Sequence, residues 1–310
     1  MIRATHYGKS NVALYRSYAK PLRGLTPVPE SAFGGRENIL FAADVDVRVY
    51  GDNFKPAYTA GDNTMVVATD SMKNFVLKGA LDYEGATQEG FLDFLGRRFL
   101  ETYPQMEALR LQGKELPFEA ATVPGEGGFT RSERLFSPSG GDCGFAELEF
   151  SRHDGGVRVT GHRCGRLGLK LVKVSGSSFA GFFRDAHTTL PERVDRPLYI
   201  FLDVYWRYDK VGDLIAEDHS LYVAAEQVRD VVGAVFHDFV SMSIQHLLHE
   251  MGGRILSRFP QLAEVSFEAQ NRLWDTAFVA EEDEGRKVYR DPHPPYGQIA
   301  LTMTQGEQDG

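Results

Sequence analysis

A short segment that ends in hydroxyl and carboxylate side chains is the first place where this sequence could do chemistry. The apolar run at 66–68 is followed by Thr69, Asp70 and Ser71, which are residue types that accept hydrogen bonds from a first helical turn. The segment therefore predicts a helix N-terminus, where a hydroxyl and a carboxylate lie beside free backbone donors and the positive end of the helix dipole. An ordinary helix cap would have the same sequence, so the segment alone does not separate a cap from a binding site.

Metal and nucleotide chemistry find little support in the sequence. The run His246–Glu250 holds two histidines and a glutamate, but it lacks the spacing of a zinc-protease helix and a clear third ligand. Cys143 and Cys164 form no Cys-x-x-Cys pair, and we expect both to be free thiols. No Gly-x-Gly-x-x-Gly follows a strand, and no Walker loop is present. These observations disfavour a metal site and a nucleotide-binding loop.

The elements that must position such residues occur twice along the chain. The segment RFLETYPQM at 98–106 matches RILSRFPQL at 254–262, so that residue 98 corresponds to residue 254 at an offset of 156 residues. Each copy ends a helix at a proline and then turns into an alternating strand. Two copies of one supersecondary unit explain the match. We therefore predict two domains, residues 1–153 and residues 154–310.

Hydrophobic periodicity predicts two strands, two helices and two further strands in each half. The expected strands are 11–20, 38–50, 107–112 and 144–151, then 157–174, 197–208, 263–271 and 299–304. The expected helices are 69–82, 87–103 and two within 226–259. This order indicates an α+β protein whose antiparallel sheets carry helices on one face. We expect 124–144 and 280–286 to be solvated loops, because the first is rich in Gly, Ser and Pro and the second in charge.

Composition restricts the class of protein. The 310 residues, 42% apolar and 25% charged, are typical of a soluble globular chain with two domains of ordinary size. The net charge of −9 disfavours a nucleic-acid partner, and no window approaches the about 20 apolar residues that span a bilayer. The first residues lack the apolar core of a signal peptide, and the last residues carry no peroxisomal address. We expect a cytoplasmic protein that binds neither nucleic acid nor membrane.

Six short motifs resemble those of the urate oxidase (uricase) family, and they follow the family's order. They are Tyr7–Val12, Ala68–Asn74, Phe179–Asp185, Asp195–Pro197, Ser243–Gln245 and Gln270–Asn271. The resemblance covers nearly the whole chain and implies two tunnelling-fold units in tandem, each a four-stranded antiparallel sheet with two helices on one face (ββααββ). It also implies that the sheets of two chains join into a barrel, that the assembly is a homotetramer, and that the active sites lie at subunit interfaces.

The resemblance implies oxidation of urate by dioxygen and water to 5-hydroxyisourate and hydrogen peroxide, without a metal or an organic cofactor. Phe179 matches the family's stacking phenylalanine, and Arg196 matches its substrate arginine, whose planar fork suits two neighbouring acceptor atoms. Gln245 matches the carboxamide that clamps one edge of urate, and Ile244 matches the residue whose backbone amide faces the ligand. Each of these four residues also has an ordinary structural explanation. In the order named, they could be a core aromatic, a surface arginine, a polar residue on a helix and a buried helix residue.

A second group of residues resembles the family's proton-transfer machinery. Thr69 and Asp70 match residues that meet urate from the neighbouring subunit, and Lys9 with Thr69 matches the proton-relay pair. Asn271 matches the asparagine that holds dioxygen or water over the purine face. Leu273 departs from a common pattern, because many relatives place a histidine there and leucine cannot transfer protons. We therefore assign no catalytic histidine.

Two other functions remain open from the sequence. A different tandem tunnelling-fold enzyme would act on a pterin or purine, typically anchored by a glutamate, whereas Gln245 with Arg196 favours urate. A non-catalytic purine-binding protein would have lost the relay. Leu273 is the one feature that favours this reading, and Lys9 with Thr69 disfavours it.

Overall fold

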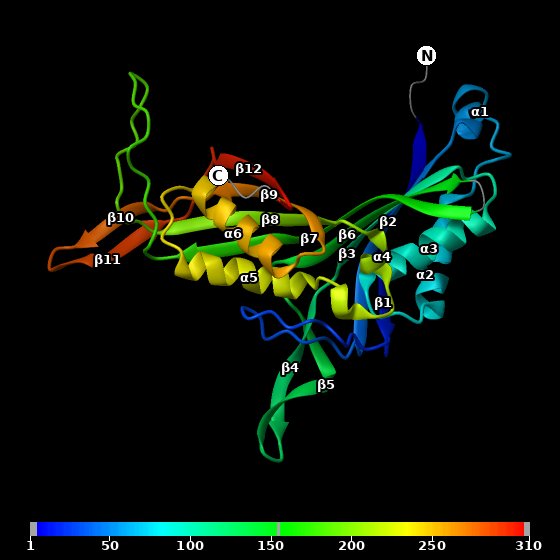
Figure 1. Cartoon of the computed structure of the whole chain (residues 1–310), viewed down its shortest axis with the longest axis horizontal. Helices are drawn as coiled ribbons and strands as arrows, with labels where there is room; N and C mark the ends of the chain where they lie inside the picture. Colours follow the sequence, from blue (N-terminus) through cyan, green and yellow to red (C-terminus); the bar gives the residue numbers. More distant parts are fainter. Residues whose placement is uncertain (1–4, 154–155, 307–310) are drawn as a thin grey trace. The chain divides into compact units, whose positions relative to one another are not determined.

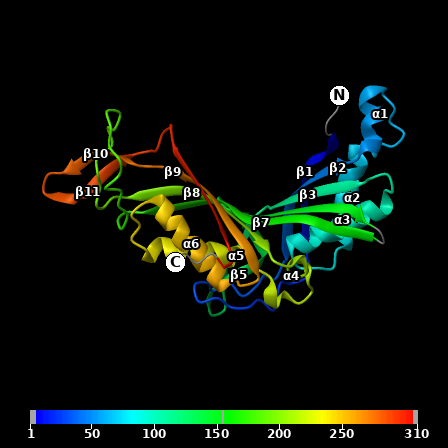
Figure 2. The ribbon, with the colours of Figure 1, turned by 45° about the horizontal axis from the view of Figure 1, so that its top comes forward.

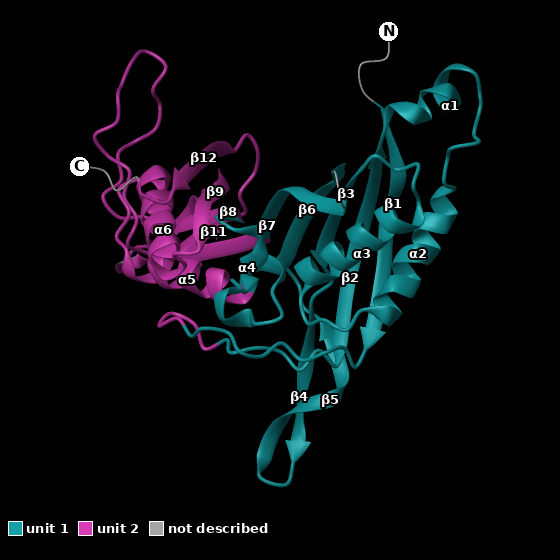
Figure 3. Cartoon of the chain, turned by 45° about the vertical axis from the view of Figure 1, so that its right-hand side comes forward, with its two compact units in different colours: residues 1–27, 33–165, 207–225 teal, residues 28–32, 166–206, 226–310 magenta. Residues whose placement is uncertain are grey.

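The chain, described here by a computed structural model over residues 5–153 and 156–306, divides into two compact units (Figure 3). The first unit comprises residues 1–27, 33–165 and 207–225, and the second comprises residues 28–32, 166–206 and 226–310. Each unit holds a sheet with two helices on one face, which confirms the predicted α+β class. The domain boundary predicted at 153–154 borders residues 154 and 155, which lie outside the described residues, and it stays a prediction.

The sheet of the first unit is antiparallel and contains the four predicted strands, although the first begins at residue 6 and ends at residue 17 instead of running over 11–20. Its order is β1 (His6–Ser17), β2 (Leu40–Tyr50), β3 (Ala108–Glu115) and β6 (Cys143–His153), followed by the first part of β7 (Gly156–Lys173). Val45, Val47 and Val49 alternate along β2 and are fully buried. Their side chains belong to the part of this unit's core that the sheet contributes.

Two helices supply the other half of that core. α2 (Thr69–Asp82) packs against β1, and α3 (Gln88–Thr102) packs against β3 and β6. Phe91, Leu95 and Phe99 recur at helical spacing on α3 and are fully buried. Both predicted helices are confirmed. The short elements of this unit are η1 (Asp52–Phe54), α1 (Lys55–Thr59), α4 (Val211–Ile215) and η2 (His219–Leu221).

The second unit repeats this arrangement. Its sheet has the order β7, β8 (Leu198–Tyr208), β9 (Leu262–Asn271) and β12 (Gly297–Thr304). Figure 2 shows α5 (Ala225–Asp238) and α6 (Ile244–Arg258) on one side of β8 and β9. α5 begins at residue 225 against 69 for α2, and α6 begins at 244 against 88 for α3. The helices therefore keep the offset of 156 residues, which confirms the internal repeat.

The two predicted loops are largely strands. Residues 124–144 contain most of a hairpin made by β4 (Phe118–Gly125) and β5 (Gly128–Pro138). Residues 280–286 form the tip of a second hairpin, made by β10 (Asp275–Ala280) and β11 (Asp283–Arg290). Both hairpins extend from the sheets of their units (Figure 1). The prediction was wrong because backbone pairing holds such exposed hairpins together and requires little apolar alternation.

Glu30 fastens the segment 28–32 to α6 within the second unit. Its carboxylate accepts a hydrogen bond from Arg254 at 3.0 Å and a two-pronged set from Arg258 at 2.8–3.0 Å. The Glu30 side chain is 8% exposed. The hydrogen bonds from Arg258, helped by those from Arg254 and opposed by burial, lower the pKa of Glu30 to about 2.

We expect Glu30→Gln to lower the free energy of unfolding by about 2 kcal/mol, because two guanidinium groups lose a shared carboxylate. The folded-state pKa lies below that of an unfolded glutamate, about 4.3, so the stabilisation is complete above that pH and is lost as the pH falls toward 2. Denaturant unfolding at pH 7 and pH 3 measures both effects. The control is Glu37→Gln, which breaks an exposed pair with Arg23 and should cost less than about 0.5 kcal/mol. A difference between Glu30→Gln and the parent protein that is the same at both pH values would contradict this account.

Candidate active site

Two loop segments of the second unit are joined by backbone hydrogen bonds at Phe179. Phe179 and Arg193 exchange both backbone hydrogen bonds, at 2.8 and 3.0 Å. The backbone N–H of Arg196 donates to the Ser177 carbonyl at 2.9 Å. This pairing brings the Phe179 and Arg196 side chains together, although a loop separates them in the sequence.

The start of α6 joins the same strip of backbone. The Ser178 N–H donates to the Ser241 carbonyl at 2.8 Å. Ser243 is the N-cap of α6, and its hydroxyl accepts a hydrogen bond from the backbone N–H three residues later at 3.1 Å. Ile244 is 4% exposed and anchors the first turn in the core, whereas the Gln245 side chain is exposed. Gln245 is therefore available to a ligand at a helix start that is held rigidly.

Arg196 is a partly buried cation. Its guanidinium carbon lies 5.5 Å from the Phe179 ring centroid. Its Nε atom is buried and has no hydrogen-bond partner within the described part of the chain. Burial, and secondly the charge of Arg193, lower the pKa of Arg196. A planar anion that accepts from the fork would relieve this desolvation.

The ring of Phe179 is already covered on one face. Phe182 stacks on it with the ring centroids 4.9 Å apart and the planes inclined by 13°. Phe182 therefore occupies one of the two faces on which a planar ligand could stack, a contact that the sequence motif did not indicate.

Asn271 ends β9, opposite Gly297 of β12. Its Oδ1 atom is buried and, among residues 5–153 and 156–306, accepts no hydrogen bond. The next residue, Arg272, donates its backbone N–H to the Tyr199 carbonyl at 2.8 Å, so the position of Asn271 is set by β8 and β12 together. An unpaired buried acceptor at a fixed position suits a small ligand that donates, such as water.

An open pocket of about 600 Å³ lies over the same strands. Phe201, Gln270, Arg272 and Gln298 contribute to its lining. The guanidinium carbon of Arg272 lies 4.3 Å from the Phe201 ring centroid and 3.5 Å from that of Tyr296. Arg272 was not predicted as a site residue, and no sequence signal points to it, because its partners meet only when β8, β9 and β12 pair.

In the first unit, the start of α2 lies against β1. The Tyr7 hydroxyl accepts a hydrogen bond from the Val67 N–H at 3.0 Å, which holds the residues before α2 on the strand. The predicted helix N-terminus is confirmed, but Thr69 is the first helical residue, and Ala68 is the N-cap without a side-chain hydrogen bond. The Thr69 hydroxyl has no hydrogen-bond partner among the described residues. It therefore does not serve as a cap.

Lys9 lies on β1 opposite Val47, within electrostatic reach of the same helix start. The hydrogen bond from Lys73 lowers the pKa of Asp70, and the charge of Lys9 acts in the same direction. Gly8 permits the close approach of β1 to β2, because a Cβ at this position would lie 1.8 Å from the Val47 carbonyl oxygen. In the described part of the chain Lys9 forms no salt bridge, so its ammonium group is available for another partner.

The predicted site residues thus form two groups. Lys9, Thr69 and Asp70 belong to the first unit. The other predicted residues belong to the second unit and are Phe179, Arg196, Ile244, Gln245 and Asn271. The roles of both groups stay predictions.

We expect Ser243→Ala to lower stability by about 1 kcal/mol and to raise several-fold the KM for urate, the substrate that the resemblance implies, because the first turn of α6 loses its cap. Thr87→Ala is the matched control. Thr87 caps α3 in the first unit, accepting from Gly90 N–H at 3.1 Å, and it corresponds to Ser243 at the offset of 156 residues. Unfolding and steady-state kinetics should give similar stability losses and a changed KM for Ser243→Ala alone. A KM change of the same size in both variants would contradict the role of the α6 start.

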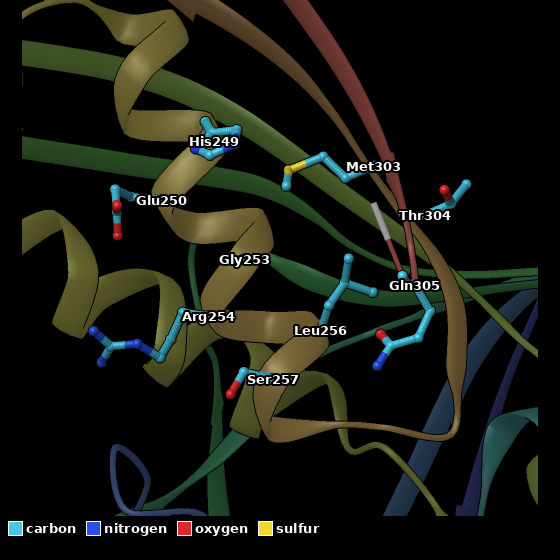
Figure 4. A pocket seen from close by; sticks show the side chains of 10 residues that line it. His249, Glu250, Gly253, Arg254, Leu256, Ser257, Met303, Thr304 and Gln305 are labelled. Carbon is cyan, nitrogen blue, oxygen red and sulfur yellow. The ribbon is translucent and has the colours of Figure 1, made fainter. Parts of the chain in front are cut away.

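Figure 4 shows another open pocket, of about 450 Å³, between α6 and the end of β12. His249, Glu250 and Arg254 line it from the helix, and Met303 and Thr304 line it from the strand. No three His, Cys, Asp or Glu side chains are grouped to hold a metal ion in the ranges that the structure describes. Nor is any described helix long and apolar enough to cross a membrane.

Two sheet-and-helix repeats, with a desolvated arginine beside an aromatic ring and a capped helix start, define a tandem-repeat α+β protein with a candidate site for a planar anion. The chain matches the uricase family over residues 46–145 and 162–300. It belongs to the uricase family. The predicted family and the predicted enzyme class, an oxidoreductase of the urate oxidase type, are confirmed with it.

Curated relatives and solved structures agree with this membership. The chain is 47% identical to the uricase of Haloferax volcanii over 98% of this chain and 99% of that protein. It is 46% identical to the bifunctional uric acid degradation protein of Bacillus subtilis, over 100% of this chain but 63% of that longer protein. The crystal structure of urate oxidase from Bacillus sp. TB-90 matches with a TM-score of 0.94 and 45% identity, covering 97% of this chain and 100% of that chain.

Proposed function

We propose that this chain oxidises urate in purine degradation, using dioxygen and water and producing 5-hydroxyisourate and hydrogen peroxide without a metal or organic cofactor. The observation that carries the proposal is the partly buried Arg196 guanidinium, which lies 5.5 Å from the Phe179 ring centroid and has a buried Nε without a partner in the described chain. Urate is flat and anionic, so it supplies both the stacking face and the acceptor atoms that this pair lacks.

In this proposal the second unit binds the purine. Phe179 stacks on its face, Arg196 donates two parallel hydrogen bonds to one edge, and the Gln245 carboxamide clamps another edge. The backbone amide of Ile244 is one of the first-turn donors that a helix leaves without a partner, and it adds a hydrogen bond near the positive end of the dipole. Asn271 holds dioxygen or water above the ring through its unpaired amide oxygen and its NH₂ group.

The first unit supplies the proton-transfer groups. Thr69 and Asp70 meet urate from a neighbouring subunit. Lys9 with Thr69 accepts a proton from urate, and the loss of this proton makes urate electron-rich. Urate then loses two electrons to dioxygen, which takes up two protons to become hydrogen peroxide, and water adds to the oxidised purine as the new hydroxyl group. Leu273 cannot transfer protons, which leaves a relay of Lys9, Thr69 and water or one that borrows another histidine, and we propose the first. This arrangement requires an oligomer with active sites at subunit interfaces, and we propose that it is a homotetramer that functions in the cytoplasm.

A turnover assay tests the function. Purified protein is mixed with urate in chelator-treated buffer, and urate absorbance, oxygen uptake and peroxide are followed together. One dioxygen consumed and one peroxide formed per urate supports the proposal. Urate binding without turnover would favour the non-catalytic reading, and turnover of a pterin without urate binding would favour the other tunnelling-fold enzyme. Native mass measurement of the same sample tests the tetramer.

A further inference from the structure

The first unit contains a counterpart of the candidate site in the second unit. At the offset of 156 residues, Gln88 and Glu89 correspond to Ile244 and Gln245 as the first two residues of α3 and α6. At the same offset Glu115 corresponds to Asn271, and each is the last residue of its strand. The two repeats therefore place polar side chains at matching positions.

The loop pairing is repeated as well. Leu22 and Arg36 exchange both backbone hydrogen bonds, at 2.8 and 3.1 Å, as Phe179 and Arg193 do in the second unit. Leu22 thus corresponds to the stacking phenylalanine. Asn38 lies two residues before β2, where Arg196 lies two residues before β8. The cation of the second unit has a neutral amide as its counterpart.

These counterparts surround a small cavity of about 70 Å³. Its lining includes Arg36, Asn38, Gln88, Glu89, Glu115 and Tyr222. All of these residues belong to the first unit. Arg36 forms an ion pair with Glu115, and Gln88 donates to the Gly113 carbonyl at 2.6 Å. The polar frame of the cavity is therefore built from internal hydrogen bonds.

Tyr222 lines this cavity and places its side chain against the frame. Its side chain is 6% exposed and packs in an apolar cluster with Leu22 and Leu25. Its hydroxyl donates to Glu89 Oε2 at 2.8 Å. The Tyr222 ring therefore packs in one cluster with the counterpart of Phe179, and its hydroxyl donates to the counterpart of Gln245. A ligand in the second unit is proposed to make the same two kinds of contact.

We propose that the first unit retains a ring-binding cradle, defined by Leu22, Asn38, Glu89 and Glu115, which the chain itself fills with Tyr222. The cradle takes a small neutral ring with a hydrogen-bond donor, such as phenol, once the tyrosine ring is removed. Arg36 is already paired with Glu115, so the carboxylate of Glu89 and the amide in place of Arg196 disfavour an anion such as urate. The statement about urate rests on the proposed function, whereas the cradle and its neutral ring do not.

Phenol rescue of Tyr222→Ala tests the cradle. We expect the variant to lose roughly 10 °C in Tm, because a buried ring and its hydrogen bond are removed. Phenol at millimolar concentration should restore at least about 3 °C in this variant, and it should not stabilise the parent protein or Tyr222→Phe, whose cradles are filled. Benzene, which has no donor for Glu89, should restore less. Absence of a phenol effect, or an equal effect in the parent protein or with benzene, would overturn the proposal.

A second measurement covers a variant that does not fold alone. Refolding yield of Tyr222→Ala is compared with phenol, with benzene and without additive, and a yield that does not depend on phenol would also overturn the proposal. Urate titration separates this inference from the proposed function. Failure of the parent protein to bind urate would contradict the function and leave the phenol result standing. Two urates bound per chain of Tyr222→Ala would contradict the neutral-ring cradle.

Discussion

Replacing Lys9 by methionine is expected to reduce urate turnover by about 10²- to 10⁴-fold, while the KM changes only a few-fold. Methionine retains an unbranched side chain of similar length on β1, so the strand pairing with Val47 is kept and only the proton-transfer group is lost. Steady-state kinetics with urate at several pH values measures the effect on kcat and KM separately.

Thr69→Ala should reproduce this loss in part, and Thr69→Ser should recover turnover because it restores the hydroxyl. The control is Lys20→Met, which removes an exposed lysine beyond the end of β1 and should leave kcat unchanged. A kcat for Lys9→Met that is within a few-fold of the parent protein would remove Lys9 from the proposed relay.

Arg196→Ala is expected to weaken urate binding by about 10²- to 10³-fold, because two charge-assisted hydrogen bonds to the anion are lost, at about 3–4 kcal/mol in total. Arg196→Lys should recover only part of this affinity, since an ammonium group cannot donate two parallel bonds. Equilibrium binding of urate without dioxygen measures the affinity apart from turnover.

Arg193→Ala is the matched control for charge. Arg193 is exposed and its charge lowers the pKa of Arg196, so its loss should change urate affinity by less than about threefold and leave the two-pronged contact in place. Equal losses in Arg193→Ala and Arg196→Ala would indicate a general charge effect, and an unchanged affinity in Arg196→Ala would refute the proposed contact.

Most of the regular fold could be predicted from the sequence because its signals are local. The stripe of Phe91, Leu95 and Phe99 has helical spacing, and Val45, Val47 and Val49 alternate as a half-buried strand requires. The repeat at 98–106 and 254–262 indicated two copies of one unit. By contrast, the hairpins at 118–138 and 275–290 are exposed and carry little apolar pattern, so composition suggested loops where backbone pairing makes strands.

The candidate site was predicted through motifs, and its environment was not. The sequence places Phe179, Arg196 and Gln245 in separate motifs, and the structure adds the backbone bonds through Ser177, Ser178 and Ser241 that join their segments. Desolvation of Arg196 and the stacking of Phe182 depend on how these loops fold over one another. No spacing rule contains that information.

The sequence by itself determined the α+β class, the internal repeat, the uricase resemblance and the residue types that could meet a planar anion. These follow from periodicity and short motifs, which are read over a few neighbouring residues. Only the tertiary structure decided that Thr69 is not a cap, that Arg196 is desolvated beside Phe179, and that Tyr222 fills the matching place in the first unit. Burial and hydrogen bonding between residues far apart in the chain arise when the sheets and helices pack, so local sequence cannot specify them.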